Sequence, residues 1–289
     1  MNVANLALYP CVMGIINVTP DSFHADSRVS EAGALRARVI QILDEGGRML
    51  DVGACSTRPG APSVSEAEEM ARLEWALPIV AAAIDEWLQG HEGEERPAVS
   101  VDTFRARVAE RCVRHLRVDV INDISGGTIE PAMLDVVART RAPYIMMHMR
   151  GTPEDMQRLT DYHEGVTAEV RRFFGQQLQR LREACDRAGN EVPTVILDPG
   201  YGFAKTVAQN YTLMRDLGQL IVDMPGMPML VGISRKSMIQ RVLDTDAAHA
   251  LNGTTVLNTY ALMQGAHILR VHDVREAVEA VRLVKAIAQ

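Results

Sequence analysis

Eight short apolar runs recur along the chain, and each ends in or beside a polar residue. They read VMGIIN, RMLDVG, AVSVD, VDVIND, YIMMHM, VILDPG, MLVGIS and ILRVHD. Their length and their β-branched residues predict strands. Between them apolar residues recur at helical spacing, as at Leu35, Val39 and Ile42, and longer helices are predicted over roughly 162–189 and 247–264.

This alternation of strands and helices predicts right-handed βαβ units and a parallel sheet. About eight such pairs in 289 residues fit a TIM (β/α)8 barrel better than an open doubly wound sheet. The segment GHEGEERP predicts a polar surface loop. Because no shift in composition marks a boundary, we expect an α/β fold with a single domain over residues 1–289.

Polar residues stand at the carboxyl ends of the predicted strands. They are Asn17, Asp51, Asp102, Asn122 with Asp123, His148, Asp198, Ser234, and Arg270 with His272. One such Asp would indicate only a cap for the next helix. In a barrel, however, all of these ends converge on one mouth, where TIM-barrel active sites lie. The pattern therefore predicts a site at that mouth, although His148 could simply orient loops by hydrogen bonding.

Composition and charge narrow the class of protein. The chain is 47% hydrophobic and 23% charged, as in ordinary globular proteins, and a net charge of -7 argues against nucleic-acid binding. Its four cysteines have no CxxC and no zinc spacing, which indicates reduced thiols. The amino terminus does not resemble a signal peptide, and no apolar run reaches the ~18 residues of a membrane helix. We expect a cytoplasmic protein with no membrane and no nucleic-acid partner.

Two motifs near the amino terminus could bind phosphate groups. In MGIINVTPDSF, Asn17 at a strand end offers a neutral oxygen suited to Mg²⁺ beside a phosphate, or else stabilises a turn. In DVGACSTRPGA, small residues allow a close approach of the backbone, and Thr57 and Arg58 can bind phosphate oxygens. The alternative is a surface turn.

Three later motifs supply carboxylates and an amide. VDTF, VINDISGG and LDPGYGFAK place Asp102, Asn122 and Asp198 at strand ends, where they can grip a flat heterocycle with adjacent N–H and C=O groups. Phe203 is either an apolar wall of this site or a core residue. A glycosidase pair of carboxylates is a weaker interpretation of the same residues.

The carboxyl-terminal motifs carry positive charge. In GISRKS, a strand leads into a helix whose amino terminus favours anions, with Lys236 and Ser237 beside it. In AHILRVHDV, Arg270 and His272 share one face of a strand because they lie two positions apart. These residues predict an anion-binding face.

These motifs, in this order, resemble those of the dihydropteroate synthases, a pterin-binding TIM-barrel family of folate biosynthesis that sulfonamides inhibit. The resemblance runs from about Val12 to Val281. It implies a transferase that joins 6-hydroxymethyl-7,8-dihydropterin diphosphate to p-aminobenzoate and releases diphosphate, with Mg²⁺ and a homodimer formed by the last helices.

The resemblance also implies roles for single residues. The residues implied to bind the pterin are Asp102, Asn122, Ile124, Met147, Asp198, Gly202 and Lys236. Those implied to bind the diphosphate are Asn17, Thr57, Arg58, Arg270 and His272, with Asn17 as a ligand of Mg²⁺. Those implied to bind p-aminobenzoate are Pro59, Phe203, Lys236 and Ser237. The catalytic residues implied are Lys236, Arg270, His272 and Asp102.

The chain departs from the commoner family pattern at two places, and three other functions remain open. SFHADSR stands where many members carry a Gly-Gly pair, and Cys55 replaces a usual Glu before STRP, which leaves the role of Arg28 open. The alternatives are a methyltetrahydrofolate methyltransferase, a silent pterin-binding module and a phosphosugar barrel enzyme. The cluster of Lys236, Arg270 and His272 disfavours the first and the third.

Overall fold

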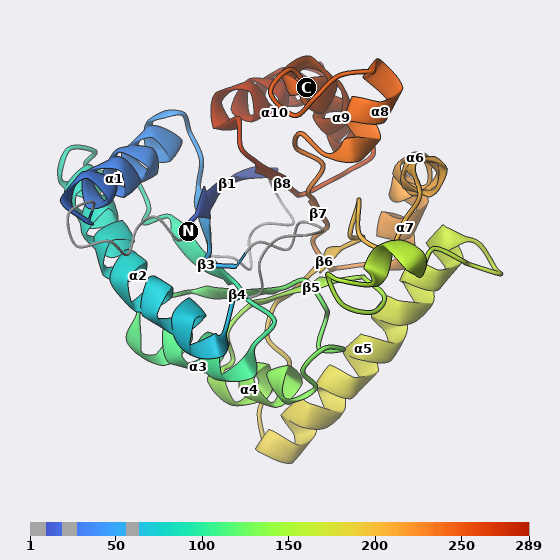
Figure 1. The fold of residues 1–289 in the computed structure, drawn as a ribbon, viewed down its shortest axis with the longest axis horizontal. Helices are drawn as coiled ribbons and strands as arrows, with labels where there is room; N and C mark the ends of the chain where they lie inside the picture. Colours follow the sequence, from blue (N-terminus) through green and yellow to red (C-terminus); the bar gives the residue numbers. More distant parts are fainter. Residues whose placement is uncertain (1–9, 19–27, 56–63, 289) are drawn as a thin grey trace.

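Eight parallel strands form a nearly closed barrel in the computed structural model, which describes residues 10–18, 28–55 and 64–288 (Figure 1). The strands are β1 (Cys11–Asn17), β2 (Met49–Gly53), β3 (Ala98–Asp102), β4 (Val120–Asp123), β5 (Tyr144–Met147), β6 (Val195–Asp198), β7 (Leu230–Val231) and β8 (Ile268–Val271). Their order is β6-β5-β4-β3-β2-β1-β8-β7. A parallel bridge between Leu197 and Met229 links the two ends of this order. The predicted barrel is confirmed.

Helices surround the strands (Figure 1). They are α1 (Arg28–Asp44), α2 (Glu66–Gln89), α3 (Ala106–His115), α4 (Ala132–Thr140), α5 (Val166–Ala188), α6 (Val207–Arg215), α7 (Leu217–Asp223), α8 (Ser237–Leu243), α9 (Leu251–Met263) and α10 (Val274–Ile287), with a 3-10 turn at Met156–Arg158. Among the helices of the described part of the chain, none has an apolar stretch that could span a membrane.

Local signals set the helix ends. The predicted stop of α5 is confirmed, because Gly189 adopts the left-handed conformation with φ 68° and closes the helix. The same helix begins at Val166, four residues later than predicted, after Gly165 with φ 85°. At α6, Thr206 and Gln209 form a reciprocal capping box.

Inside the barrel an apolar layer fills the amino-terminal half of the strands. It consists of Cys11, Met13, Met49, Ala98, Val120, Ile145, Ile196, Leu230 and Ile268, all buried. A second, larger core lies between the strands and the helices. Because side chains alternate along a strand, the residues two positions further on also point into the barrel. On five strands the next inward position is polar, at Asp51, Ser100, Asn122, Asp198 and Arg270.

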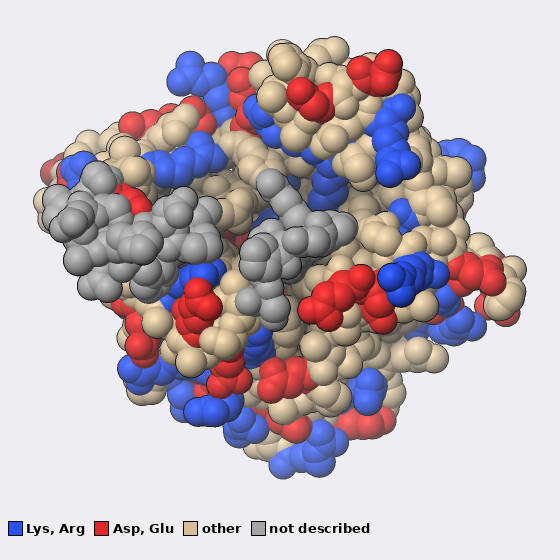
Figure 2. Space-filling model, viewed as in Figure 1, with Lys and Arg blue, Asp and Glu red and all other residues tan. Residues whose placement is uncertain are grey.

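Charged side chains of both signs are interspersed over the face shown in Figure 2. This distribution accords with the modest net charge of -7. The chain therefore offers local clusters of charge, and the cluster at the mouth is described next.

Candidate active site

Arg270 lies at the centre of a charged network inside the mouth. Its Nε donates to Asp51 Oδ2 at 2.7 Å, and its Nη2 donates to Asp102 Oδ2 at 2.7 Å. Asn122 Nδ2 also donates to Asp51 Oδ2, at 3.0 Å. Strands β2, β3, β4 and β8 therefore meet through their inward side chains.

Burial shapes the charges of this network. Burial raises the pKa of Asp102, and the Arg270 guanidinium opposes that rise. Burial alone would lower the pKa of Arg270, but Asp51 and Asp102 raise it above its ordinary value. Arg270 thus stays charged and shares its single positive charge between the two poorly hydrated carboxylates, Asp51 and Asp102.

The structure joins two groups of residues that the sequence suggested were separate. We expected Asp102 to bind the pterin and Arg270 to bind the diphosphate at two adjacent sites. The two side chains instead form an ion pair, so the acidic and basic parts of the site are in direct contact. Asp51, which the sequence marked only as a polar strand end, is fully buried and joins Arg270 to Asn122.

Lys236 lies across the mouth at the start of α8. Its Nζ donates to the Tyr201 carbonyl at 2.5 Å and stands 4.7 Å from the centre of the Phe203 ring. A side chain at Gly202 would approach Lys236 Cδ to 3.2 Å, so the glycine leaves room for the lysine. Burial lowers the pKa of Lys236 to about 8, and Asp198 opposes this shift. Lys236 is therefore charged at neutral pH but close to losing its proton.

Asp198 ends β6 and is 6% exposed. Its Oδ1 accepts from the Gly200 amide at 2.8 Å. Burial raises the pKa of Asp198, and Lys236 and the Gly200 amide counter that effect. Asp198 and Lys236 thus carry opposite charges that act on each other at this rim.

An apolar cluster borders the polar groups. Ile124, Met147, Met149, Met156 and Ala204 are buried together, and Phe104, Ile129 and Phe203 pack against them. The cluster brings together Ile124 and Met147, which were expected to contact the pterin. Phe203 is partly exposed, which accords better with a wall than with a core residue.

His272 lies beside Ser234, whose hydroxyl contacts both the ring and the backbone amide of His272. Ser234 Oγ is 3.0 Å from His272 Nδ1 and accepts from the His272 amide at 3.2 Å. From α1, Arg38 Nη2 donates to the His272 carbonyl at 2.6 Å. The sequence did not single out Arg38, because no local pattern links α1 to the end of β8.

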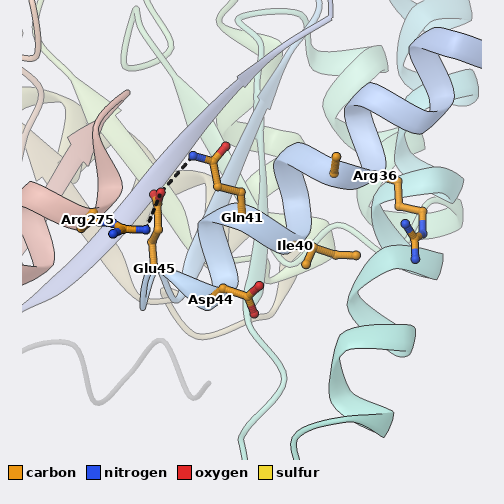
Figure 3. Close-up of a pocket in the computed structure, with 7 residues that line it drawn as sticks. Arg36, Ile40, Gln41, Asp44, Glu45 and Arg275 are labelled. Carbon is orange, nitrogen blue, oxygen red and sulfur yellow. Dashed lines mark hydrogen bonds and ion pairs between the residues drawn. The ribbon is translucent and has the colours of Figure 1, made fainter.

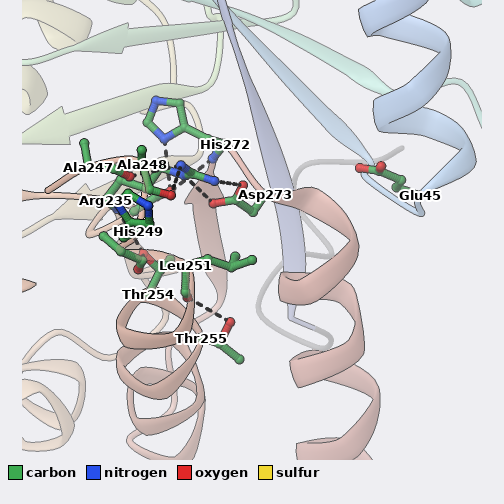
Figure 4. Close-up of polar contacts among 12 residues, drawn as sticks. Glu45, Arg235, Ala247, Ala248, His249, Leu251, Thr254, Thr255, His272 and Asp273 are labelled. Atoms are coloured by element: carbon green, nitrogen blue, oxygen red, sulfur yellow. Dashed lines mark hydrogen bonds and ion pairs between the residues drawn. The ribbon is translucent and has the colours of Figure 1, made fainter. Parts of the chain in front are cut away.

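Arg235 clamps the turn that carries Lys236 (Figure 4). Its guanidinium pairs with both carboxylate oxygens of Asp273, at 2.7 and 2.8 Å, and its Nη1 also donates to the Ala247 carbonyl at 3.0 Å. The Arg235 amide donates to Thr254 Oγ1 at 3.0 Å. Arg235 has φ 56°, so these contacts hold a backbone conformation that non-glycine residues rarely adopt.

The remaining predicted residues lie at the edge of the described structure or outside it. Asn17 ends β1 and is exposed, as is Ser237 at the start of α8. Thr57, Arg58 and Pro59 lie outside the described residues, as does most of the loop after Asp21.

Cys55, which replaces a usual Glu of the family pattern, is a protonated thiol. Burial raises its pKa to about 12, and the nearby Glu69 carboxylate adds to this rise. Arg105 Nη1 lies 3.5 Å from the Cys55 sulfur and also pairs with Glu69. A thiol with so high a pKa is a poor nucleophile at neutral pH.

A cavity of about 420 Å³ outside the strands is not this site (Figure 3). It lies between α1 and α10 and is lined by Arg36, Gln41, Asp44, Glu45 and Arg275, with two apolar residues. Its walls carry none of the inward residues of the mouth.

Asn17 fits a magnesium ion that is held mainly by a substrate. Within residues 10–18, 28–55 and 64–288, no cluster of three His, Cys, Asp or Glu could hold a metal by itself. Mg²⁺ commonly takes one or two protein oxygens and completes its shell with phosphate oxygens and water. A single exposed amide oxygen at the end of β1 suits that arrangement.

Comparisons with known proteins agree with this geometry. The profile of the family described as pterin binding enzyme matches residues 13–272. The dihydropteroate synthase of Escherichia coli strain K12 is 38% identical over 278 residues, which cover 96% of this chain and 92% of that protein. The Synechocystis dihydropteroate synthase is 40% identical over 277 residues, covering 96% and 89%.

Solved structures show the same fold. A Yersinia pestis dihydropteroate synthase in complex with a sulfonamide drug has a TM-score of 0.79 and 37% identity, with 98% of this chain and 95% of that chain covered. A Xanthomonas albilineans dihydropteroate synthase with 4-aminobenzoic acid has a TM-score of 0.80 and 33% identity, with 98% and 94% covered. This chain therefore belongs to the pterin binding enzyme family.

Proposed function

We propose that this chain is a transferase that condenses 6-hydroxymethyl-7,8-dihydropterin diphosphate with p-aminobenzoate to give 7,8-dihydropteroate and diphosphate. The observation that carries the proposal is the single rim shared by Asp102, Asp198, Lys236 and Arg270. That rim offers carboxylates for an amino-heterocycle and cations for a leaving diphosphate. The names of its relatives support the same reaction.

The pterin takes the acidic side of the mouth. Its amino-pyrimidinone edge presents adjacent N–H donors, which Asp102 and Asp198 accept, while the amide of Asn122 can serve a donor or an acceptor. Ile124 and Met147 pack against its faces. Gly202 leaves room for Lys236, which donates to the pterin carbonyl.

The diphosphate takes the basic side. Arg270 lies in β8, and His272 directly follows the strand, two positions further along. Thr57 and Arg58 complete the proposed binding set. Asn17 would hold Mg²⁺, which supplies positive charge to the diphosphate oxygens when bound. Because Arg270 already pairs with Asp102, its charge lies at the junction of the ring and its diphosphate tail.

The second substrate enters beside α8. Phe203 and Pro59 flank the ring of p-aminobenzoate, and Ser237 binds its carboxylate near the Lys236 ammonium. This arrangement points the arylamine toward the pterin methylene group. Lys236 thus contacts both substrates and sets the distance between them.

The reaction begins with loss of the leaving group, because an arylamine is a weak nucleophile. The bond from the methylene carbon to the diphosphate oxygen breaks, and the electron pair leaves with the diphosphate, whose added charge Arg270 and His272 stabilise. The methylene carbon becomes cationic, and Asp102 and Asp198 stabilise the ring that shares this charge. The amine then bonds to the methylene carbon and loses a proton to water.

We also propose a cytoplasmic homodimer built on the last helices. The packed pair α9 and α10 exposes large apolar side chains, with Met263 68%, Leu283 67% and Ile287 80% exposed. A second copy of this face would remove them from water. Sedimentation should show a dimer at micromolar concentration, and Met263→Glu with Leu283→Glu should give a monomer. A monomeric wild-type chain would refute the dimer.

The decisive experiment combines both purified substrates with Mg²⁺ and measures diphosphate release and dihydropteroate. We expect release that requires both substrates and falls when a sulfonamide competes with p-aminobenzoate. Tight pterin binding by calorimetry without turnover would show a silent binding module instead. Methyl transfer from methyltetrahydrofolate to a corrinoid protein would support the methyltransferase.

A further inference from the structure

Lys205 occupies a position that is unusual for this chain. Only three lysines, Lys205, Lys236 and Lys285, stand among 27 arginines. Lys285 is exposed on α10 and Lys236 lies at the mouth, but Lys205 is 4% exposed in the interior after β6. A lysine concentrates its charge in a compact group, whereas arginine spreads it over a planar fork. The function proposed above assigns no role to Lys205.

Four acceptors surround the Lys205 side chain. Its Nζ lies 2.9 Å from His148 Nδ1, 2.9 Å from the Gly200 carbonyl, 3.0 Å from the Phe203 carbonyl and 3.4 Å from the His148 carbonyl. Burial lowers the pKa of Lys205 to about 7, and the Asp198 carboxylate opposes this shift. Burial and the charge of Lys205 lower the pKa of His148 well below its ordinary value. The neutral ring of His148 therefore accepts from the lysine.

The loop between β6 and α6 needs such a partner. It turns through left-handed conformations at Gly200 (φ 71°), Gly202 (φ 83°) and Ala204 (φ 51°), so its carbonyls point in several directions. Side chains take all five consecutive carbonyls: Lys205 those of Gly200 and Phe203, Lys236 that of Tyr201, Gln157 that of Gly202, and Tyr162 that of Ala204.

The two lysines bind different carbonyls of the same loop. Lys205 binds those of Gly200 and Phe203, and Lys236 binds that of Tyr201. The loop also supplies the Phe203 ring against the Lys236 ammonium and the Gly202 backbone against its stem. Any shift of the loop would therefore move the groups that contact the Lys236 side chain.

We infer that Lys205, paired with His148, is a positioning residue that fixes the loop of residues 200–204 and thereby places Lys236 and Phe203 for p-aminobenzoate. We expect Lys205 to contact neither substrate, because it is 4% exposed and its Nζ is bound by carbonyls of the loop itself. The inference rests on the proposed function. His148 Nε2 is buried without a partner, but the Lys205 side chain makes several hydrogen bonds, which rigidify the loop. Loss of Lys205 would leave buried carbonyls unsatisfied.

The test is a kinetic comparison of Lys205→Met with the wild type. Methionine keeps the length and volume but removes all three donors, so we expect KM for p-aminobenzoate to rise at least tenfold, with a smaller change in the dissociation constant of the pterin diphosphate. His148→Phe retains an aromatic ring at this position and leaves the bonds of Lys205 to the Gly200 and Phe203 carbonyls. It should raise KM for p-aminobenzoate less than Lys205→Met does. Lys285→Met is the matched control on an exposed lysine and should change neither quantity.

A merely structural role predicts a different result. In that case Lys205→Met would lower the melting temperature and the fraction of active sites, while KM of the remaining active enzyme stayed at the wild-type value. That outcome in an active wild-type background overturns the inference. A wild-type chain without any turnover would overturn the proposed function instead.

A second measurement covers a variant that fails to fold. Lysine labelled with carbon-13 at Cε gives three side-chain signals in this chain, and Lys236→Met and Lys285→Met assign the Lys205 signal by elimination. Addition of p-aminobenzoate with unreactive 6-hydroxymethylpterin should shift the Lys205 signal, although Lys205 does not touch the ligands. A shift confined to the Lys236 signal would contradict the inference.

Discussion

The loops after β6 and β7 each bring a lysine to the same end of the barrel, yet they hold it by different physical means. After β6, Lys205 is buried and bound by neutral carbonyls and a neutral histidine. After β7, the turn is clamped by the partly exposed ion pair of Arg235 and Asp273, and its lysine, Lys236, faces the mouth. In our proposal the first lysine positions the loop, and the second contacts the substrates.

The two loops therefore separate the positioning of the site from the binding of ligands. Hydrogen bonds to carbonyls in the core are directional and shielded from water, so they suit a fixed scaffold. A lysine at the mouth must bind and release ligands, so only part of its donor capacity can be committed to the protein.

Lys236→Met should have the largest effect on catalysis. Loss of the ammonium removes a contact to both substrates, and we expect kcat/KM to fall about 10³-fold, or ~4 kcal/mol. Steady-state kinetics and a thermal melt check this. The melting temperature should change little, because the Tyr201 carbonyl can turn to water, and Lys285→Met again serves as the control. A stable Lys236→Met variant with nearly full activity would remove Lys236 from the mechanism.

Arg270→Ala should come next. We expect diphosphate release to slow at least 100-fold, roughly 2.7 kcal/mol, because the leaving group loses its nearest fixed cation. The variant should also unfold more readily, since Asp51 and Asp102 would be left as unpaired buried carboxylates. Rapid-quench measurement of diphosphate and urea unfolding test the two effects. Arg275→Ala, on an exposed arginine of α10, should change neither, and wild-type turnover by Arg270→Ala would exclude the role.

The pH dependence should separate Lys236 from a permanently charged residue. Burial lowers the pKa of Lys236 to about 8, so its ammonium is present below that pH and is lost above it. We therefore expect kcat/KM to fall about tenfold between pH 7 and pH 9. In Lys236→Arg the charge does not titrate, so the weaker activity that remains should lack this alkaline fall. An identical fall in both enzymes would assign it to another group.

Arg235→Lys should have the smallest effect. Lysine keeps the charge but cannot bond both oxygens of Asp273 and the Ala247 carbonyl in one plane, so the turn before α8 should loosen. We expect KM for p-aminobenzoate to rise about fivefold, or ~1 kcal/mol. Arg241→Lys, on an exposed arginine of α8, is the matched control. Equal KM values in the two variants would show that the clamp does not act on the site.

Much of the fold and part of the site followed from local patterns. All eight strands lie where apolar runs predicted them, and Asp102, Asn122, Asp198 and Arg270 reach the same mouth. Asp51 was recognised as a polar strand end but not as a partner of Arg270. Arg38 gave no signal of its role, because its partner His272 lies 234 positions away. Lys205 gave none either, because its bonds to the nearby carbonyls depend on the folded loop and His148 lies 57 positions away. That the chain is a single domain remains a prediction.

The sequence by itself determined which residues face the interior of the barrel, since side chains alternate with a period of two, and it determined that polar groups gather at one rim, since parallel strands end together. Only the tertiary structure decided which of those groups pair. Arg270 and Asp51 are 219 positions apart and meet because the barrel brings their strands beside β1. Pairing depends on distances of a few ångströms across the closed sheet, and no local spacing along the chain encodes them.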